Sequence, residues 1–351
     1  MKNNLQLYGW NNTLNQFKEE SPHKSFNYGR VAIVHRTCYD IISEDGLFQC
    51  ELSGNMMYGK SSFELPCTGD WVFFQTFDEN KGIIIDMFPR EHTLFRKKNG
   101  TVAEKQAIAS YIDKAFIVQS LDNNFNVRRI ERFMFQVLEE NIKPVLIFNK
   151  TDLGFDKQKV EESLQHLDKQ MPVFFTSILQ ADSINRLREY IQKGETVVFV
   201  GSSGVGKSSL INALCENSEL ITSDISSSTS KGRHTSTRRE MVIMKNSGIL
   251  IDTPGVREFG LAADNPESLA DMLDISEYAE LCRFKNCTHT DEPGCAVLEA
   301  VNNSTLDVKV YESYIKLRRE ALHFSTTKLE KRKKEKNLSR LIEEVKKLKE
   351  N

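Results

Sequence analysis

The sequence predicts a multidomain chain with an N-terminal β-barrel, a central doubly wound α/β domain and a C-terminal helical domain that binds a metal. Three observations support this prediction. Short strand patterns fill about the first hundred residues, strands then alternate with helices, and cysteines cluster with a histidine in the last third. The 351 residues suffice for two or three domains. We expect the domain boundaries at 1–100, 101–264 and 265–351.

The N-terminal domain contains five short strand patterns that turn residues separate. Such a series is typical of a small closed barrel, and an OB-fold is the natural candidate. OB-folds often bind nucleic acid, although a purely structural barrel is also consistent with the pattern. The five patterns are Arg30–Val34, Tyr39–Ile42, Leu47–Leu52, Asp70–Gln75 and Gly82–Asp86.

The central domain alternates apolar strand patterns with helical spacing of apolar residues from Ala115 to Gly255. This alternation is typical of a parallel sheet with helices on both faces. The predicted strands include Pro144–Phe148, Pro172–Phe175, Thr196–Val200 and Gly248–Ile251. The predicted helices are Asn126–Leu138, Lys157–Gln170 and Asp182–Gln192.

A glycine-rich loop, Gly201–Ser208, lies between the strand Thr196–Val200 and a helical segment, Ser209–Leu214. Its backbone N–H groups can surround phosphates, Lys207 can reach the β and γ oxygens, and the Ser208 hydroxyl can bind Mg²⁺. A chance glycine-rich turn explains this context poorly. The expected nucleotide contacts in this loop are Ser203, Gly204, Val205, Gly206, Lys207, Ser208 and Ser209.

A second motif, Asp252-Thr253-Pro254-Gly255, follows the last predicted strand of this domain. Asp252 would hold Mg²⁺ through water, and the Gly255 N–H would contact the γ-phosphate. Taken alone, the motif is also consistent with a turn that ends a strand. Its position after a phosphate loop favours the nucleotide-binding interpretation.

A third motif, Asn149-Lys150-Thr151-Asp152, is typical of a guanine-binding loop. Asp152 can accept hydrogen bonds from the N1–H and exocyclic amine of guanine, a donor pair that adenine lacks, which disfavours an ATPase. Asn149 can bond guanine O6 or brace the loop, and the Lys150 stem can lie over the base. Ser177, after the next strand, is the expected second guanine-side contact. A polar cap on the following helix is the alternative.

The serial order of these loops is unusual, because the guanine loop precedes the phosphate loop. In ordinary GTPases the phosphate loop opens the domain and the guanine loop comes near its end. The order therefore predicts a circularly permuted α/β P-loop GTPase domain.

The polar segment 222–238 lies between the phosphate loop and Asp252 and is the expected first switch. Either Thr235 or Thr237 would complete the Mg²⁺ shell when the γ-phosphate is present. A flexible loop with no catalytic role is the alternative.

The hydrolysis machinery is less evident, because Val256 stands where many GTPases carry a glutamine that orients the attacking water. Intrinsic hydrolysis should therefore be slow. Lys207 and His234 are the candidate catalytic groups, and a solvated loop histidine is the alternative for His234.

Four residues form a Cys-x4-Cys-x-His-x5-Cys pattern that suits one tetrahedral, structural Zn²⁺: Cys282, Cys287, His289 and Cys295. Unmetallated loop cysteines are the alternative. Seven cysteines in total, with no hydrophobic leader or long apolar span, favour a reduced, cytoplasmic setting without membrane attachment. The scattered Cys38, Cys50, Cys67 and Cys215 are expected to be small core residues.

The lysine-rich end, Lys328–Asn351, has helical spacing of apolar residues, as expected for a solvated helix or for one that touches phosphates or a partner helix. Because the net charge is only −2, nucleic acid would have to bind local basic patches.

Taken in order, the barrel, the permuted loops, the segment Gly232-Arg-His-Thr-Ser-Thr237 and the cysteine pattern resemble ribosome small subunit-dependent GTPase A, the RsgA/YjeQ family. The resemblance implies a monomeric bacterial GTPase that binds GTP and GDP and acts late in 30S subunit assembly. It also implies 16S rRNA contacts through the barrel and zinc domains, and subunit-stimulated hydrolysis that drives release. In this family, the histidine of the first switch, which matches His234, has been considered catalytic. The N-terminal thirty residues and the lysine-rich tail lie outside its shared pattern.

Two functions therefore remain. One is a GTPase whose hydrolysis times its departure from a ribosomal precursor, and the other is an rRNA-binding assembly factor in which GTP acts only as a conformational lock.

Overall fold

The computed structural model describes residues 4–58, 60–97, 105–122, 125–167, 171–215, 240–244, 248–253 and 268–322. The chain divides into two compact units, the first made of residues 1–95, 107–164 and 169–258, and the second of residues 96–106, 165–168 and 259–351. In the described ranges, no helix combines the length and apolar character that crossing a bilayer requires.

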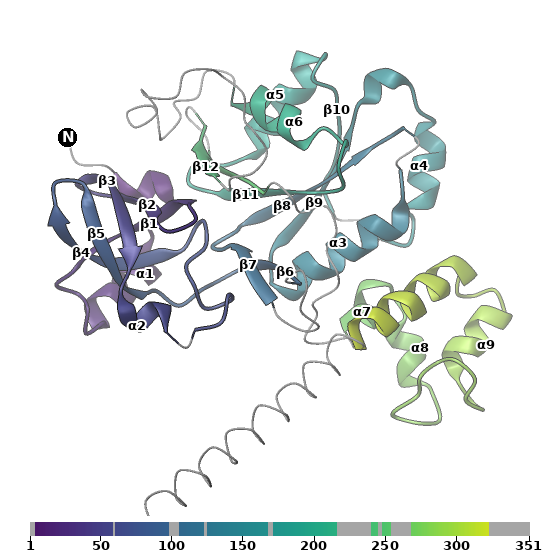
Figure 1. Cartoon of the computed structure of the whole chain (residues 1–351). Coiled ribbons are helices and arrows are strands. Elements are labelled where there is room, and N and C mark those ends of the chain that lie inside the picture. The colour runs from purple at the N-terminus through teal and green to yellow at the C-terminus, as the bar shows by residue number, and fades with distance from the viewer. Residues whose placement is uncertain are drawn as a thin grey trace, which may run out of the picture. The chain divides into compact units, whose positions relative to one another are not determined.

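The first unit begins with a closed five-stranded barrel (Figure 1). Its strands pair in the order β1-β2-β3-β5-β4, and β4 pairs again with β1, which leaves no open edge. Only the β3–β5 pair is parallel. The strands are β1 (Asn27–Val34), β2 (Tyr39–Ser43), β3 (Gly46–Leu52), β4 (Trp71–Asp78) and β5 (Lys81–Met87), with the short helix α2 (Gly54–Met57) between β3 and β4. The predicted small closed barrel is confirmed.

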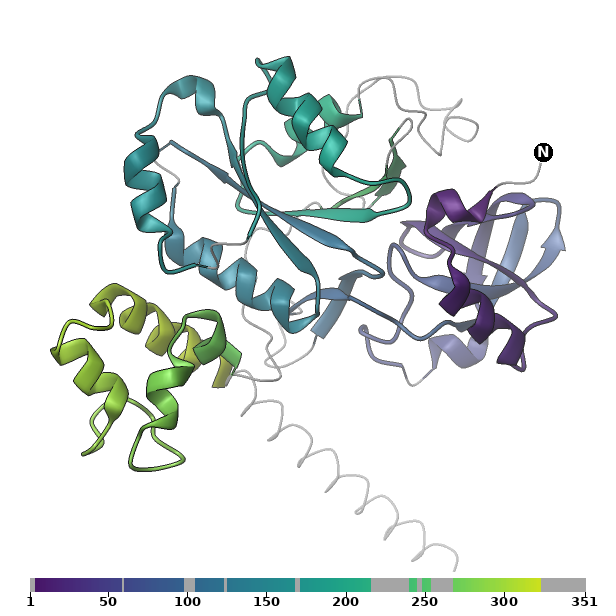
Figure 2. The ribbon, with the colours of Figure 1, turned by 180° about the vertical axis from the view of Figure 1, so that it is seen from behind.

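The N-terminal extension, which the sequence left unassigned, folds against the barrel (Figure 2). It consists of a 3-10 helix, η1 (Leu5–Tyr8), and the helix α1 (Asn12–Glu20). Between them, the Trp10 ring lies 4.7 Å from the Tyr28 ring and 4.9 Å from the ring of Trp71, which is 1 % exposed. Aromatic contacts at these centroid distances stabilise the packed state beyond the area they bury.

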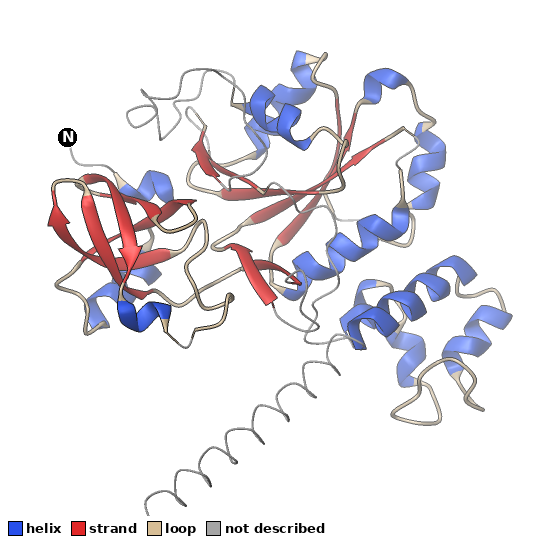
Figure 3. Cartoon of the chain, viewed as in Figure 1, coloured by secondary structure: helices blue, strands red, loops and turns tan. Residues whose placement is uncertain are grey.

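The α/β part of the first unit is a sheet in the order β10-β9-β8-β11-β13-β12 (Figure 3). All neighbouring pairs in it are parallel except β12 with β13. Its strands are β8 (Lys114–Ser120), β9 (Lys143–Asn149), β10 (Val173–Thr176), β11 (Thr196–Val200), β12 (Glu240–Ile243) and β13 (Ile249–Asp252). A separate two-stranded sheet pairs β6 (Leu94–Lys97) with β7 (Lys105–Ala109).

Helices cover both faces of this sheet, with α3 and α4 on one side and α5 and α6 on the other (Figure 1). Every residue of β11 is buried, as expected for a strand between two helical layers. The helices are α3 (Val127–Glu139), α4 (Lys157–Ser163), α5 (Ala181–Tyr190) and α6 (Lys207–Leu214), with the 3-10 turn η2 (Thr151–Leu153) after β9. The predicted doubly wound architecture is confirmed.

One predicted helix is too long. The sequence predicted a helix over Lys157–Gln170, but α4 ends at Ser163. The Ser163 hydroxyl donates to the Val160 carbonyl at 2.7 Å, and the Leu164 N–H bonds Glu161 O in a tighter turn. Serine side chains that bond the preceding turn in this way compete with helix propagation.

The second unit contains the predicted helical C-terminal region. Its described helices are α7 (Ser268–Met272), α8 (Ser276–Glu280), α9 (Ala296–Asn302) and a helix over residues 308–322. Its buried apolar residues include Leu269, Ile275, Val297, Leu317 and Ala321. The lysine-rich segment Lys328–Asn351 lies outside the described residues.

Within the first unit, Arg30 of β1 links the barrel to the α/β sheet. Its side chain is 1 % exposed. Its guanidinium donates to Gly69 O at 2.9 Å, Tyr8 O at 2.6 Å, Tyr111 O at 3.3 Å and Thr196 Oγ1 at 3.0 Å. One buried side chain thus joins the N-terminal extension, the barrel and the first residue of β11. The strands β1 and β12 also pair directly, at Ile33 and Glu240.

Replacing Arg30 by methionine should destabilise the first unit strongly, because several buried acceptors would lose their donor. Burial lowers the pKa of Arg30 to about 10, so it is charged at neutral pH, and the Asp113 carboxylate opposes the shift. Removing one partner of a buried charged network costs about 3–5 kcal/mol. Thermal unfolding should show a midpoint roughly 6–20 °C lower, at about 2–4 °C per kcal/mol. Arg36→Met, at an exposed neighbouring position, is the control; equal midpoints would contradict the prediction.

Candidate nucleotide site and candidate metal centre

The glycine-rich loop joins β11 to α6, and two of its positions admit only glycine. Gly201 has φ 148° and Gly206 has φ 93°. A Cβ on Gly201 would lie 2.4 Å from Val118 O, and a Cβ on Gly206 would lie 2.3 Å from Asn149 Nδ2. The left-handed backbone and these close approaches explain why the sequence carries glycine at both positions.

Lys207, the first residue of α6, folds back over this loop. Its Nζ donates to Gly201 O at 2.7 Å and to Ser202 O at 2.8 Å. The ammonium therefore lies at the carbonyl side of the loop, beside the N-terminus of α6. A helix N-terminus with a lysine and a glycine-rich loop is a favourable site for phosphate groups.

Asn149 connects the guanine loop to the phosphate loop. Its Nδ2 donates to Val205 O at 2.9 Å, and its Oδ1 accepts from the Thr176 hydroxyl at 3.2 Å. Asn149 is 3 % exposed, so its amide braces the two loops within the protein. Residues 56 positions apart in the chain are thereby held together.

Asp152 and Ser177 lie together on the neighbouring loops. The Ser177 hydroxyl donates to Asp152 Oδ1 at 2.5 Å, and Thr151 Oγ1 donates to Thr176 O at 3.2 Å. Ser177 is buried, whereas Asp152 is exposed on η2. The serine thus orients a carboxylate that faces solvent, as base recognition by hydrogen bonds requires.

Lys150 makes an ion pair with a residue just after β8. Its backbone has φ 64°, in the left-handed region. Its Nζ lies 3.1 Å from Asp122 Oδ2, and Asp122 Oδ1 accepts from the Ser120 hydroxyl at 2.8 Å. This ion pair ties the guanine loop to the end of β8.

The carboxyl ends of five parallel strands bring these loops to one edge of the sheet. The strands β8, β9, β10, β11 and β13 run parallel, so their last residues share that edge. Asp252 ends β13, and the following Thr253 donates its hydroxyl to Phe199 O at 2.8 Å. Ligands of open α/β sheets bind at this edge.

Several predicted site residues lie outside the described residues. These are the candidate catalytic His234, the candidate Mg²⁺ ligands Thr235 and Thr237, and Gly255, the expected γ-phosphate contact. The described loop residues Ser203, Gly204, Ser208 and Ser209 lie between β11 and α6 or in the first turn of α6, as the strand-loop-helix pattern predicted.

Sequence reasoning missed Arg129 of α3. Its Nη1 donates to Ser202 Oγ at 2.9 Å, which brings a second cation to the phosphate loop. The available signal was the pair Arg128-Arg129 in the first turn of α3, where no acidic residue stands. Cations are unfavourable at that end of a helix, which makes the pair unusual.

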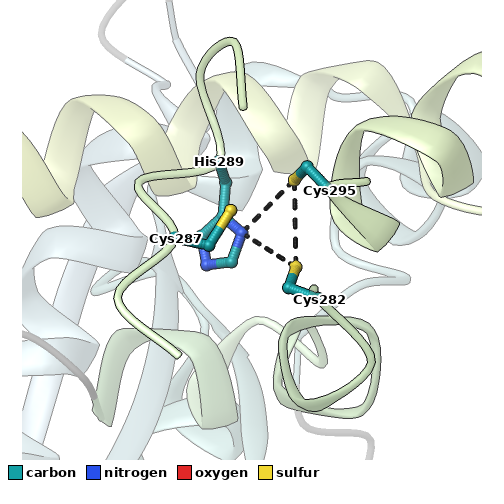
Figure 4. Close-up of side chains that lie close together, drawn as sticks. All are labelled: Cys282, Cys287, His289 and Cys295. Carbon is teal, nitrogen blue, oxygen red and sulfur yellow. Dashed lines mark hydrogen bonds between the residues drawn. The ribbon is translucent and has the colours of Figure 1, made fainter. Parts of the chain in front are cut away.

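The second unit holds the candidate metal centre (Figure 4). The ligand atoms of Cys282, Cys287, His289 and Cys295 all lie within 4.8 Å of one another. Cys282 Sγ is 3.9 Å from Cys295 Sγ, and each is 3.5 Å from His289 Nδ1. A tetrahedral zinc ion with bonds of about 2.3 Å to sulfur and 2.0–2.1 Å to nitrogen needs separations of about 3.8 Å and about 3.5 Å. The residues therefore fit one tetrahedral ion.

The loop that carries these ligands is braced by the helix over residues 308–322. The Tyr311 hydroxyl donates to His289 O at 2.8 Å, and Arg318 Nη1 donates to Thr288 O at 2.8 Å. Glu292 accepts from the Thr288 backbone at 2.7 Å. Glu292 also accepts from the Thr288 hydroxyl. The bond from this hydroxyl, followed by the bond from the Thr288 N–H, holds the pKa of Glu292 well below its usual range. A closed set of four protein ligands suits a structural ion rather than a catalytic one.

Sequence comparison relates the chain to known proteins. A family model described as RsgA GTPase matches residues 87–262, and one described as 50S ribosome-binding GTPase matches residues 196–350. The chain is 67 % identical over 349 residues to "Small ribosomal subunit biogenesis GTPase RsgA 1" of Bacteroides thetaiotaomicron, covering 99 % of this chain and 98 % of the relative. It is 37 % identical to "Small ribosomal subunit biogenesis GTPase RsgA 2" of Listeria monocytogenes, covering 90 % and 89 %.

Two solved structures share this architecture. YjeQ from Thermotoga maritima superposes with a TM-score of 0.61 at 26 % identity, over 84 % of this chain and 98 % of that one. YloQ, described as a circularly permuted GTPase, gives a TM-score of 0.58 at 27 % identity, over 86 % and 96 %.

Proposed function

The chain belongs to the RsgA family of GTPases, and on this premise we propose that it acts in biogenesis of the small ribosomal subunit. It is a GTP hydrolase, as its family and its GTPase domain indicate. The observation that carries the proposal is the Asn149–Val205 hydrogen bond, which joins the guanine and phosphate loops in the permuted order.

We propose the following roles in the nucleotide site. Asp152 and Ser177 recognise guanine, the loop over 203–209 surrounds the phosphates, and Lys207 stabilises the charge that develops on the γ-phosphate. The Mg²⁺ of the bound nucleotide is held by Ser208, Asp252 and one of Thr235 and Thr237, and Gly255 contacts the γ-phosphate. His234 is the candidate that orients the attacking water, since Val256 lacks a polar group.

The remaining proposals concern the partner. The chain binds the 30S subunit through 16S rRNA contacts of the barrel and of the second unit, and subunit-stimulated hydrolysis drives its release. It binds GTP and GDP, acts as a cytoplasmic monomer without membrane attachment, and holds one structural Zn²⁺ on its four ligands. Its domains extend over residues 1–100, 101–264 and 265–351.

GTP turnover with and without small subunits tests this function. Added 30S particles should raise the turnover rate at least tenfold, equivalent to about 1.4 kcal/mol of barrier. Large subunits are the matched control and should leave the rate nearly unchanged. If 30S particles bind in the presence of GTP without changing turnover, the nucleotide acts only as a conformational lock. If they do not bind at all, the proposed partner is wrong.

A further inference from the structure

We propose that Arg129 is a positioning residue of the phosphate loop, which holds Ser202 in place when Lys207 moves to the phosphates. The inference rests on the phosphate-loop assignment proposed above and does not depend on the ribosomal partner. It gives a role to a side chain of α3, outside the nucleotide-binding motifs of the sequence.

Two cations meet at Ser202 from different parts of the chain. Arg129 Nη1 donates to Ser202 Oγ at 2.9 Å, and Lys207 Nζ donates to Ser202 O at 2.8 Å. Ser202 is only 9 % exposed and both bonds are partly buried, which makes them stronger than bonds fully open to water. A site with two converging positive charges favours an anion.

The position of Arg129 in its helix supports the same conclusion. The Arg129 N–H donates to the Asn126 side chain at 3.1 Å, so the helix cap fixes its backbone. The helix α3 follows β8 at the carboxyl edge of the sheet, where the phosphate loop lies. A cation in the first turn opposes the helix dipole, and an anion bound at this edge would offset that unfavourable interaction.

Nucleotide binding explains why the loop needs this second contact. Lys207 bonds two loop carbonyls, those of Gly201 and Ser202, with two of its three N–H donors, so it must give up at least one carbonyl to reach both a β and a γ oxygen. The contact of Arg129 with Ser202 Oγ and that of Asn149 with Val205 O do not involve the lysine. These two contacts can therefore preserve the shape of the loop while Lys207 exchanges partners, which lowers the reorganisation needed on binding.

A double-mutant cycle on the full chain, without ribosomal subunits, tests the proposal. Arg129→Met, which keeps the apolar stem, should weaken GTP and GDP binding about tenfold, equivalent to about 1.4 kcal/mol. Ser202→Ala should weaken binding about fivefold, and the double variant should be no weaker than Arg129→Met alone. Affinities are measured by titration with fluorescent guanine nucleotides.

The controls separate positioning from general loss of structure. Arg128→Met removes an exposed charge from the same helical turn and should change affinity less than about twofold. Arg129→Lys should restore part of the affinity, because lysine also donates to a hydroxyl. The preference for GTP over ITP, which the guanine loop determines, should persist in every variant. Multiplicative effects in the double variant, or equal affinities for Arg129→Met and Arg128→Met, would overturn the proposal. Should the wild-type chain bind no guanine nucleotide, the proposed function itself fails.

Discussion

Replacing Cys295 by serine should release the metal ion and unfold much of the second unit. Cys295 is 5 % exposed, belongs to the candidate metal centre and caps α9, whose Leu298 N–H bonds its Sγ at 3.5 Å. Three described helices of this unit are short, since α7, α8 and α9 have five, five and seven residues. Isolated helices of that length are unstable in water, so they depend on packing and on the metal-ligand loop.

The expected effect is large, because structural zinc sites contribute about 10–16 kcal/mol of apparent binding free energy to the folded state. The wild-type chain should carry one zinc per chain by elemental analysis, and Cys295→Ser should carry almost none. Limited proteolysis should then cut the variant within residues 268–322 much faster than the wild-type chain. Treatment with a strong chelator should reproduce both results in the wild-type protein.

Cys38→Ser provides the matched control, since Cys38 is a half-exposed free cysteine of the barrel. It should leave zinc content and proteolysis unchanged. Guanine-nucleotide binding should persist in Cys295→Ser, because the loops of the nucleotide site lie in the first unit. A Cys295→Ser chain that keeps its zinc and resists the protease would show that the cluster is not the metal centre.

The strands of the barrel and of the parallel sheet were predictable because their patterns are local. Alternating or continuous apolar runs between turn residues identified all five barrel strands, and β11 has the predicted bounds, Thr196–Val200. The cluster of four candidate metal ligands was predictable for the same reason, since all four lie within fourteen residues. Patterns of this kind depend on chain neighbours and not on tertiary contacts.

The features that sequence reasoning missed depend on distant contacts. The packing of Trp10 on the barrel requires aromatic partners that later strands supply, and the single Ile33–Glu240 pairing leaves no periodic signal. The contact of Arg129 with Ser202 joins residues 73 positions apart. The position of Lys150 on Asp122 likewise follows from the parallel pairing of β8 with β9.

Replacing Asp152 by asparagine should shift the preference of the nucleotide site from guanine toward xanthine. The Asp152 carboxylate can accept from both guanine donors while Oδ1 also accepts from the Ser177 hydroxyl. An asparagine amide keeps one acceptor and presents a donor, which opposes the guanine amine and pairs with the xanthine C2 carbonyl. A site that leaves a hydrogen-bonding group unpaired discriminates strongly, so GTP affinity should fall at least about a hundredfold.

Competition between GTP and XTP for fluorescent GDP measures the shift, and Asp156→Asn provides the control. Asp156 lies four residues further along and caps α4, where its Oδ1 accepts from the Lys159 N–H at 3.1 Å. Asparagine caps helices as well as aspartate does, so this variant should keep both its fold and its guanine preference. The Ser177 contact makes a second test possible, because Ser177→Ala should weaken GTP binding without favouring XTP. If Asp152→Asn instead binds GTP as tightly as Asp156→Asn does, the loop at the end of β9 does not recognise the guanine base.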